Sequence, residues 1–166
     1  ATEDIIAAYF AFTATAEEVP TNLAGSAVIG IGQFLWSKIW DVNQMRLRSG
    51  VNDGGFSSAV AGWGTAFLVH HNHPREAIFN LAFAGGFLAI PSWDESEKGY
   101  ALSDGPFQPS WEATGIMAAN GGPNALPYLQ GRLNSYSGGL LEGTPDSYLE
   151  PEQALTGLQP TAWAYL

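Results

Sequence analysis

The sequence predicts an all-α protein built from repeated helical hairpins, and two observations support this prediction. First, loops rich in glycine recur, with anchoring glycines Gly55, Gly99 and Gly139 at spacings of 44 and 40 residues. A period of this length is typical of repeats with two elements per unit. Second, strongly apolar segments alternate with amphipathic ones, as inner and outer helices do in a ring or bundle. We therefore expect one domain over residues 1–166, forming a helical-hairpin toroid or part of one.

Composition limits the functional classes. The chain has 166 residues, of which 46 % are hydrophobic and 13 % are charged, so it can bury a substantial core. It contains no cysteine, which excludes disulfides and thiolate metal sites. The net charge of −10, with only six Lys and Arg residues, argues against nucleic acid and against anionic membrane surfaces. We expect neither partner, and no apolar run is long enough to span a bilayer.

The first two expected helices form one hairpin. Thr2 suits the N-cap of the first helix, because Glu3 and Asp4 then lie in the first turn, where the helix dipole favours acids. Residues 17–20, Glu-Glu-Val-Pro, break this helix. A second helix is expected over about residues 23–48, with a basic C-terminal turn, and Ser49-Gly50 ends it.

The second hairpin follows the first glycine loop. A short apolar helix is expected over about residues 60–70, and residues 71–74, His-Asn-His-Pro, break it. Pro74 then suits the first turn of the next helix. The repeat requires this helix to continue to residue 90, although Gly85-Gly86 weakens it and residues 86–90 also fit a strand.

The remaining helices follow an acidic loop over residues 91–98. Ser110 suits the N-cap of a helix that ends near Ala119 and carries Glu112 in its first turn. Another helix is expected over residues 124–134. A last one begins at Pro160, after a long acidic loop.

The glycine loops and the helices that they enter resemble those of α/α-toroid proteins. Gly-Gly-Phe or Gly-Gly-Leu leads into a Thr-Ala-aromatic-Ala type of helix, and residues 157–163, Gly-Leu-Gln-Pro-Thr-Ala-Trp, are similar to the last inner-helix entry of six-hairpin glycosidase-like proteins. The class also includes polysaccharide lyases and the cyclases and prenyltransferases. The chain lacks the Asp-rich motif of terpene cyclases and the Cys of the prenyltransferase zinc site. The resemblance therefore implies a carbohydrate-active member, and this chain is expected to be half a ring, an open arc or a fragment of a larger enzyme.

Carboxylates near the expected inner-helix entries are candidate catalytic groups. Glycoside hydrolysis needs one protonated and one ionised carboxyl group across the scissile bond. Glu112 is the candidate proton donor, because the adjacent Trp111 and partial burial would raise its pKa. Asp53 is the candidate partner, and Asp104 and Glu142 are candidate substrate-binding acids. The alternatives are a first-turn acid for Glu112, turn chemistry for Asp53 and a solvated acidic loop around Glu142.

Trp63, Trp93 and Trp111 adjoin the glycine loops, where their rings would stack against the apolar faces of sugars. A buried position in the core is the alternative for each of them. The cluster His70, His71 and His73 does not share one helix face, so a solvated turn is favoured over a metal site. No phosphate-binding loop and no nucleophile elbow are present, and we expect neither a metal nor a cofactor.

These features predict a carbohydrate-active protein that hydrolyses or binds an extracellular or periplasmic oligo- or polysaccharide. The alternative is a non-catalytic structural or assembly module. Such a module would use its apolar helices against another protein chain or another copy of itself, because the ends of an open arc expose apolar surface. A cleft that contains the candidate carboxylates and aromatics would favour the first hypothesis.

Overall fold

The structure, a computed structural model, describes residues 1–18, 22–90, 98–104 and 109–130. Its helices are α1 (Thr2–Glu18), α2 (Asn22–Phe34), the π-helical turn η1 (Leu35–Ile39), α3 (Ser58–His70), α4 (Pro74–Phe87), α5 (Trp111–Ala119) and α6 (Ala125–Gln130). Its strands are β1 (Trp40–Asp41), β2 (Arg46–Leu47), β3 (Ala89–Ile90), β4 (Gly99–Ala101) and β5 (Pro109–Ser110).

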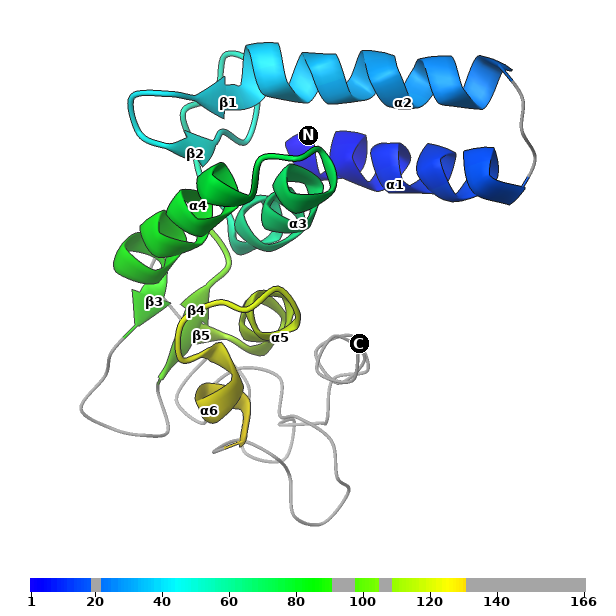
Figure 1. The fold of residues 1–166 in the computed structure, drawn as a ribbon. Helices are drawn as coiled ribbons and strands as arrows, with labels where there is room; N and C mark the ends of the chain where they lie inside the picture. Colours follow the sequence, from blue (N-terminus) through cyan, green and yellow to red (C-terminus); the bar gives the residue numbers. More distant parts are fainter. Residues whose placement is uncertain (19–21, 91–97, 105–108, 131–166) are drawn as a thin grey trace.

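The prediction of an all-α fold is wrong, because the strands form two antiparallel sheets between the helices (Figure 1). The first sheet pairs β1 with β2, and the second has the order β3-β4-β5, with Ala89 opposite Tyr100 and Tyr100 opposite Ser110. The described residues therefore have a mixed fold, in which sheets of two or three very short strands connect pairs of packed helices.

The expected helix over residues 23–48 is wrong in its last third. It ends at Ile39, and the chain then turns back as the hairpin of β1 and β2. The carboxylate of Asp41 accepts hydrogen bonds from the amides of Asn43 and Gln44, and Met45 has φ of 55°. An Asx turn and a left-handed residue compete locally with the helix, and the hairpin also places Leu47 in the core.

The expected helix from Pro74 to residue 90 ends three residues early. Pro74 does open α4, as predicted, but Phe87 is its last residue. Ala89 and Ile90 form β3, which is the strand that the sequence allowed as an alternative. Pairing with β4 satisfies backbone groups that a helix would have satisfied internally.

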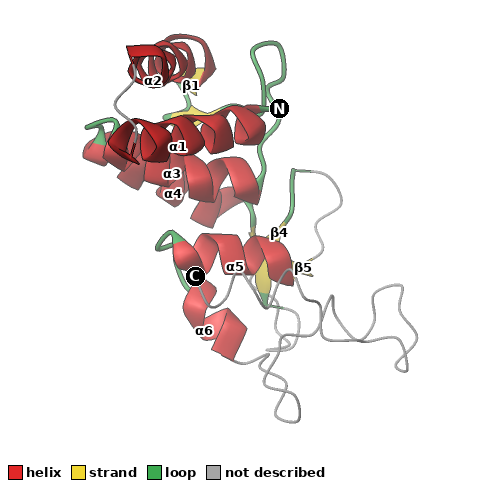
Figure 2. Ribbon diagram, turned by 90° about the vertical axis from the view of Figure 1, so that its right-hand side faces the viewer, coloured by secondary structure: helices red, strands yellow, loops and turns green. Residues whose placement is uncertain are grey.

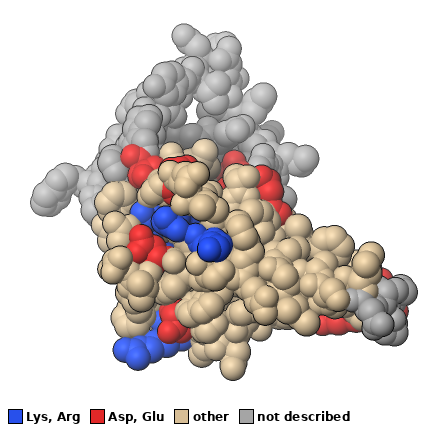
Figure 3. Space-filling model, turned by 90° about the horizontal axis from the view of Figure 1, so that it is seen from above, with Lys and Arg blue, Asp and Glu red and all other residues tan. Residues whose placement is uncertain are grey.

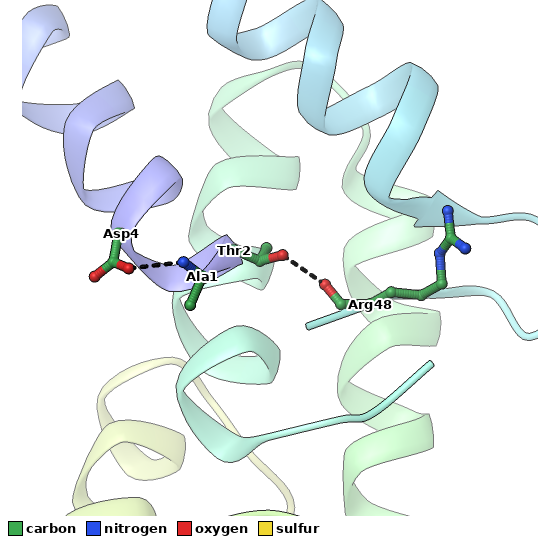
Figure 4. Close-up of polar contacts among 4 residues, drawn as sticks. All are labelled: Ala1, Thr2, Asp4 and Arg48. Carbon is green, nitrogen blue, oxygen red and sulfur yellow. Dashed lines mark hydrogen bonds and ion pairs between the residues drawn. The ribbon is translucent and has the colours of Figure 1, made fainter. Parts of the chain in front are cut away.

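The cap expected at Ser110 is confirmed, because its hydroxyl accepts the amide of Ala113. Helix α3 begins at Ser58, two residues before the expected start, and the Ser57 hydroxyl caps it by accepting the amide of Val60. The cap expected at Thr2 has another role, because its hydroxyl donates to the carbonyl of Arg48 at 2.8 Å (Figure 4). The expected helix over residues 124–134 is described as α6, and its last residues and the helix from Pro160 lie outside the described residues.

Helix α3 lies in the middle of the fold. Figures 1 and 2 place it between the α1–α2 hairpin and the α5–α6 pair, with α4 alongside. One hydrophobic cluster joins α3 to α1 and η1, and includes Ile6, Leu35 and Phe67. A second cluster joins α3 to β4, α5 and α6, and includes Tyr100 and Met117. No helix among the described residues has the length and hydropathy of a transmembrane segment.

Candidate functional site

The first turns of three helices meet at one open cleft of about 480 Å³, which we call the carboxylate cleft. Helix α1 contributes Glu3, Asp4 and Ala7, and α5 contributes Glu112 and Ile116. The start of α3 and the segment after β4 complete the lining that the structure describes, with Ser57, Ala59, Trp63, Leu102 and Ser103. Three acidic residues, two serines and a tryptophan thus line one concave surface.

The position of Glu112 follows from local sequence. The Ser110 hydroxyl caps α5, so the second helical residue, Glu112, is held in the first turn. The side chain of Thr114 donates to the Ser110 carbonyl and accepts the Tyr100 amide, which fixes the start of α5 against β4. The preceding strand and the cap therefore place Glu112 at the cleft.

The start of α1 is fixed by contacts with the loop that follows β2. The amide of Thr2 donates to the carbonyl of Ser49 at 3.1 Å, and the Thr2 hydroxyl donates to Arg48 (Figure 4). Thr2 is completely buried. The Asp4 carboxylate accepts from the Ala1 ammonium group at 2.8 Å. These bonds hold Glu3 and Asp4 at the same end of the fold as the first turns of α3 and α5.

A second, apolar groove of about 410 Å³ adjoins the cleft along α1 and α3. It shares Glu3, Ala7 and Trp63 with the cleft and adds Ile6, Phe10 and Ala66. Trp63 therefore lies where the cleft and the groove meet. A ligand that fills both would place its polar groups near Glu112 and its apolar part along Phe10.

Asp53 and Asp104 are not among the described residues that line the carboxylate cleft. The Asp53 carboxylate accepts the Gly55 amide at 2.8 Å, which is the turn chemistry given as its alternative. Both aspartates act electrostatically on Arg46, a buried residue that donates to the carbonyls of Gly54 and Gly55 at 2.5 and 3.0 Å. Burial lowers the pKa of Arg46, and the nearby carboxylates partly oppose this.

The guanidinium of Arg46 lies 5.0 Å from the ring centroids of both Phe56 and Phe83. Cation–π attraction to two rings and hydrogen bonds to two carbonyls fix the glycine loop that bears Asp53. The loop is therefore an ordered part of the framework beside the cleft.

Several predicted site residues cannot be placed. Trp93 and Glu142 lie outside the described residues, and so does the side chain of Trp111. The pKa shift expected for Glu112 from its aromatic neighbour remains a prediction. Trp63 and Glu112 are the two predicted site residues that the structure brings together.

Glu3, Asp4, Ser57 and Ser103 line the cleft but were not among the predicted site residues. Glu3 and Asp4 were interpreted only as acids favoured by the helix dipole. One signal could have indicated Glu3, because it is the second residue of α1, as Glu112 is the second residue of α5. In the part of the chain that is described, no group of three or more His, Asp or Glu residues has metal-binding geometry.

Comparison of the chain with protein-family models, with curated protein sequences and with solved structures finds no match.

Proposed function

We propose that this chain is a carbohydrate-active protein that binds an oligo- or polysaccharide in the carboxylate cleft and hydrolyses it. The observation that supports this most is the presence of Glu112, Glu3 and Trp63 in one cleft. Sugars offer hydroxyl groups to carboxylates and serine hydroxyls, and their C–H faces stack on aromatic rings. Hydrolysis also needs two carboxyl groups at one site. An extracellular or periplasmic location belongs to this proposal, because such polymers occur there.

In this proposal Glu112 is the proton donor, and the second carboxylate comes from α1. Glu3 is the preferred partner because it lines both the cleft and the apolar groove. The sequence suggested Asp53 as the partner instead. If Glu3 is the partner, replacing Glu3 should abolish hydrolysis; if Asp53 is the partner, replacing Asp53 should abolish it. Trp63 positions the sugar ring between the carboxyl groups.

The test is hydrolysis of a panel of soluble oligosaccharides by the parent and by Glu112→Gln. The amide keeps the shape of the side chain and removes the transferable proton, so turnover should fall by about 10²–10⁴-fold while binding persists. Glu17→Gln is the matched control, because Glu17 is an exposed acid of α1 that does not line the cleft. Equal turnover in Glu112→Gln and the parent would contradict the catalytic assignment.

Binding is tested separately by calorimetry with the same saccharides. Trp63→Ala should weaken binding by about 2–10-fold through loss of ring contacts, and Trp63→Phe should restore part of it. If no saccharide binds the parent, the carbohydrate hypothesis fails as a whole.

A second candidate function, an assembly module, is favoured by the exposed apolar side chains of the α1–α2 hairpin. Leu23 and Ile29 of α2 are 84 % and 61 % exposed, and Phe12 of α1 is 42 % exposed. Figure 3 shows mainly uncharged residues along this projecting hairpin. Exposed apolar patches on soluble proteins often mark sites of contact with another protein chain.

Light scattering tests the assembly function. The parent should form a dimer or larger oligomer through this hairpin, and Ile29→Lys should shift it to monomer. Gly30→Ala is the control, because it changes the neighbouring residue without adding charge. A parent that is monomeric at all concentrations would contradict self-assembly.

A further inference from the structure

A cluster of histidines joins the end of α3 to both helices of the α1–α2 hairpin and to η1. We call it the histidine joint, and it consists of His70, His71 and His73 with the residues that they contact. The predicted turn is present, with Asn72 at φ of 64°, and His70 is exposed, but the rings of His70 and His73 also pack against aromatic side chains of α1 and η1.

Each histidine contacts a different part of the hairpin. His70 Nδ1 lies 2.8 Å from the hydroxyl of Tyr9 in α1. The ring of His73 stacks on Trp36 of η1, with centroids 3.7 Å apart and planes 6° apart. His71 meets α2 at Gly32, where an added Cβ would lie 2.7 Å from its Nε2 atom. The joint therefore holds α1, α2 and η1 against α3.

His71 is poorly placed to accept a second proton. Its ring stacks on Phe67 at 5.2 Å and on His73 at 5.4 Å, and its Nδ1 atom is buried without a hydrogen-bond partner among the described residues. Protonation would place a donor and a positive charge at that buried atom. Both are unfavourable unless the ring moves into water.

The neighbouring titratable groups offer His71 no counter-charge. The groups that act on it are His73 and His70, and each would repel it when charged. Tyr9 of α1 stays a neutral phenol, because burial raises its pKa. Glu76 of α4 lies 3.9 Å from His73 and is not among the groups that act on His71. Gly32 and Trp36, from α2 and η1, carry no charge.

We propose that the histidine joint is a pH-sensitive latch, which holds the α1–α2 hairpin against α3 while His71 is neutral and releases it when His71 is protonated. Release displaces α1, whose first turn supplies Glu3 and Asp4 to the carboxylate cleft. The latch would thus open the cleft in a mildly acidic compartment. This mechanism does not depend on which ligand the cleft binds.

The direction of the pH effect follows from linkage. Burial, followed by repulsion from His73 and His70, lowers the pKa of His71 below its ordinary value of 6.5. The released state therefore binds more protons than the closed state once the pH falls below 6.5. Above pH 6.5, His71 does not disfavour the closed state. As the pH falls from 6.5 toward the lowered pKa of His71, the free energy that favours the closed state decreases.

Hydrogen exchange of the whole chain, measured at pH 7.5 and 5.5 and corrected for intrinsic rates, tests the latch. Most carboxylates stay ionised over this range. Protection of the α2 amides should fall by up to about 10-fold, the limit for one proton and a released-state pKa of 6.5. Amides of α5 should keep their protection. A parallel loss in α5 would indicate global unfolding and overturn the proposal.

Two variants test whether His71 causes the pH dependence of exchange in α2. His71→Phe keeps a stacked ring without a titratable group, so the pH dependence in α2 should disappear. His73→Phe keeps the stack on Trp36 and leaves His71 in place, so the pH dependence should persist. The opposite pattern would overturn the assignment to His71.

An NMR titration of the parent gives an answer that requires no variant to fold. The imidazole signals of His71 should titrate below pH 6.5, together with shifts of the α2 amides. A His71 pKa at or above 6.5 would overturn the latch.

Discussion

The contact between α3 and α5 depends on the absence of a side chain at Gly62, and Gly62→Ala should destabilise the protein. An added Cβ would lie 2.6 Å from the Cγ2 atom of Ile116 and 3.1 Å from its carbonyl oxygen. The methyl group can move by rotation of the Ile116 side chain. The carbonyl belongs to the α5 backbone and also accepts from Asn120 at 2.8 Å, so relief requires the helices to separate slightly.

The expected magnitude combines two opposing terms. Overpacking of a close contact costs about 1–3 kcal/mol, whereas Gly to Ala in a helix gains about 1 kcal/mol of helix propensity. The net loss should be about 1 kcal/mol, which lowers the melting temperature by about 2–4 °C for a chain of this size.

Gly30→Ala in α2 is the matched control, because nothing lies within 4 Å of its added Cβ. This variant should keep the propensity gain and melt at a higher temperature than the parent. Calorimetry gives the melting temperature of both variants. Urea unfolding, monitored by tryptophan fluorescence, gives their free energies of unfolding. If Gly62→Ala is as stable as Gly30→Ala, the helices do not meet as closely as described.

Two further predictions concern buried polar side chains that hold the framework of the cleft. Asn80 of α4 is fully buried, accepts the Leu47 amide at 2.9 Å and donates to the Ala61 carbonyl at 2.9 Å, so Asn80→Ala leaves a buried donor without its partner. Urea unfolding should show a loss of about 2–4 kcal/mol, and a loss below about 1 kcal/mol would mean that the network is unimportant. Arg46→Lys removes the forked contact with the glycine loop and should cost about 1–3 kcal/mol. Hydrogen exchange should then increase selectively in residues 52–57, and unchanged exchange there would show that Arg46 does not hold the loop.

The sequence was most informative where a local signal sufficed. Ser110 as a cap, Pro74 in a first turn and Glu112 in the first turn of its helix all depend on neighbours within one turn. The short strands gave no such signal, because strands of two or three residues show no alternation of apolar and polar positions. Their pairing is decided by contacts distant in sequence, such as Tyr100 opposite Ser110 and Ala89 opposite Tyr100.

The cleft was predictable only in part for the same reason. Glu112 and Trp63 were identified by their position at helix entries. The contribution of Glu3 depends on how α1 packs across α3, which no spacing along the chain reveals. Asp53 shows the opposite case. It lies next to a predicted helix entry, but its carboxylate accepts a hydrogen bond within its own turn and interacts electrostatically with Arg46.

The shared role of α3 has a consequence for how the molecule unfolds. Val60 and Phe67 belong to one hydrophobic cluster, whereas Ala61 belongs to the other, so adjacent residues of a single helix support both cores. Neither core can lose α3 without exposing apolar surface of the other, which couples their opening free energies. The α1–α2 hairpin and η1 supply the other side of the first cluster, so moving them from α3 opens that core while α3 keeps its contacts with α4 and α5. The first core therefore governs the position of the arm that carries two of the three acidic residues described in the cleft.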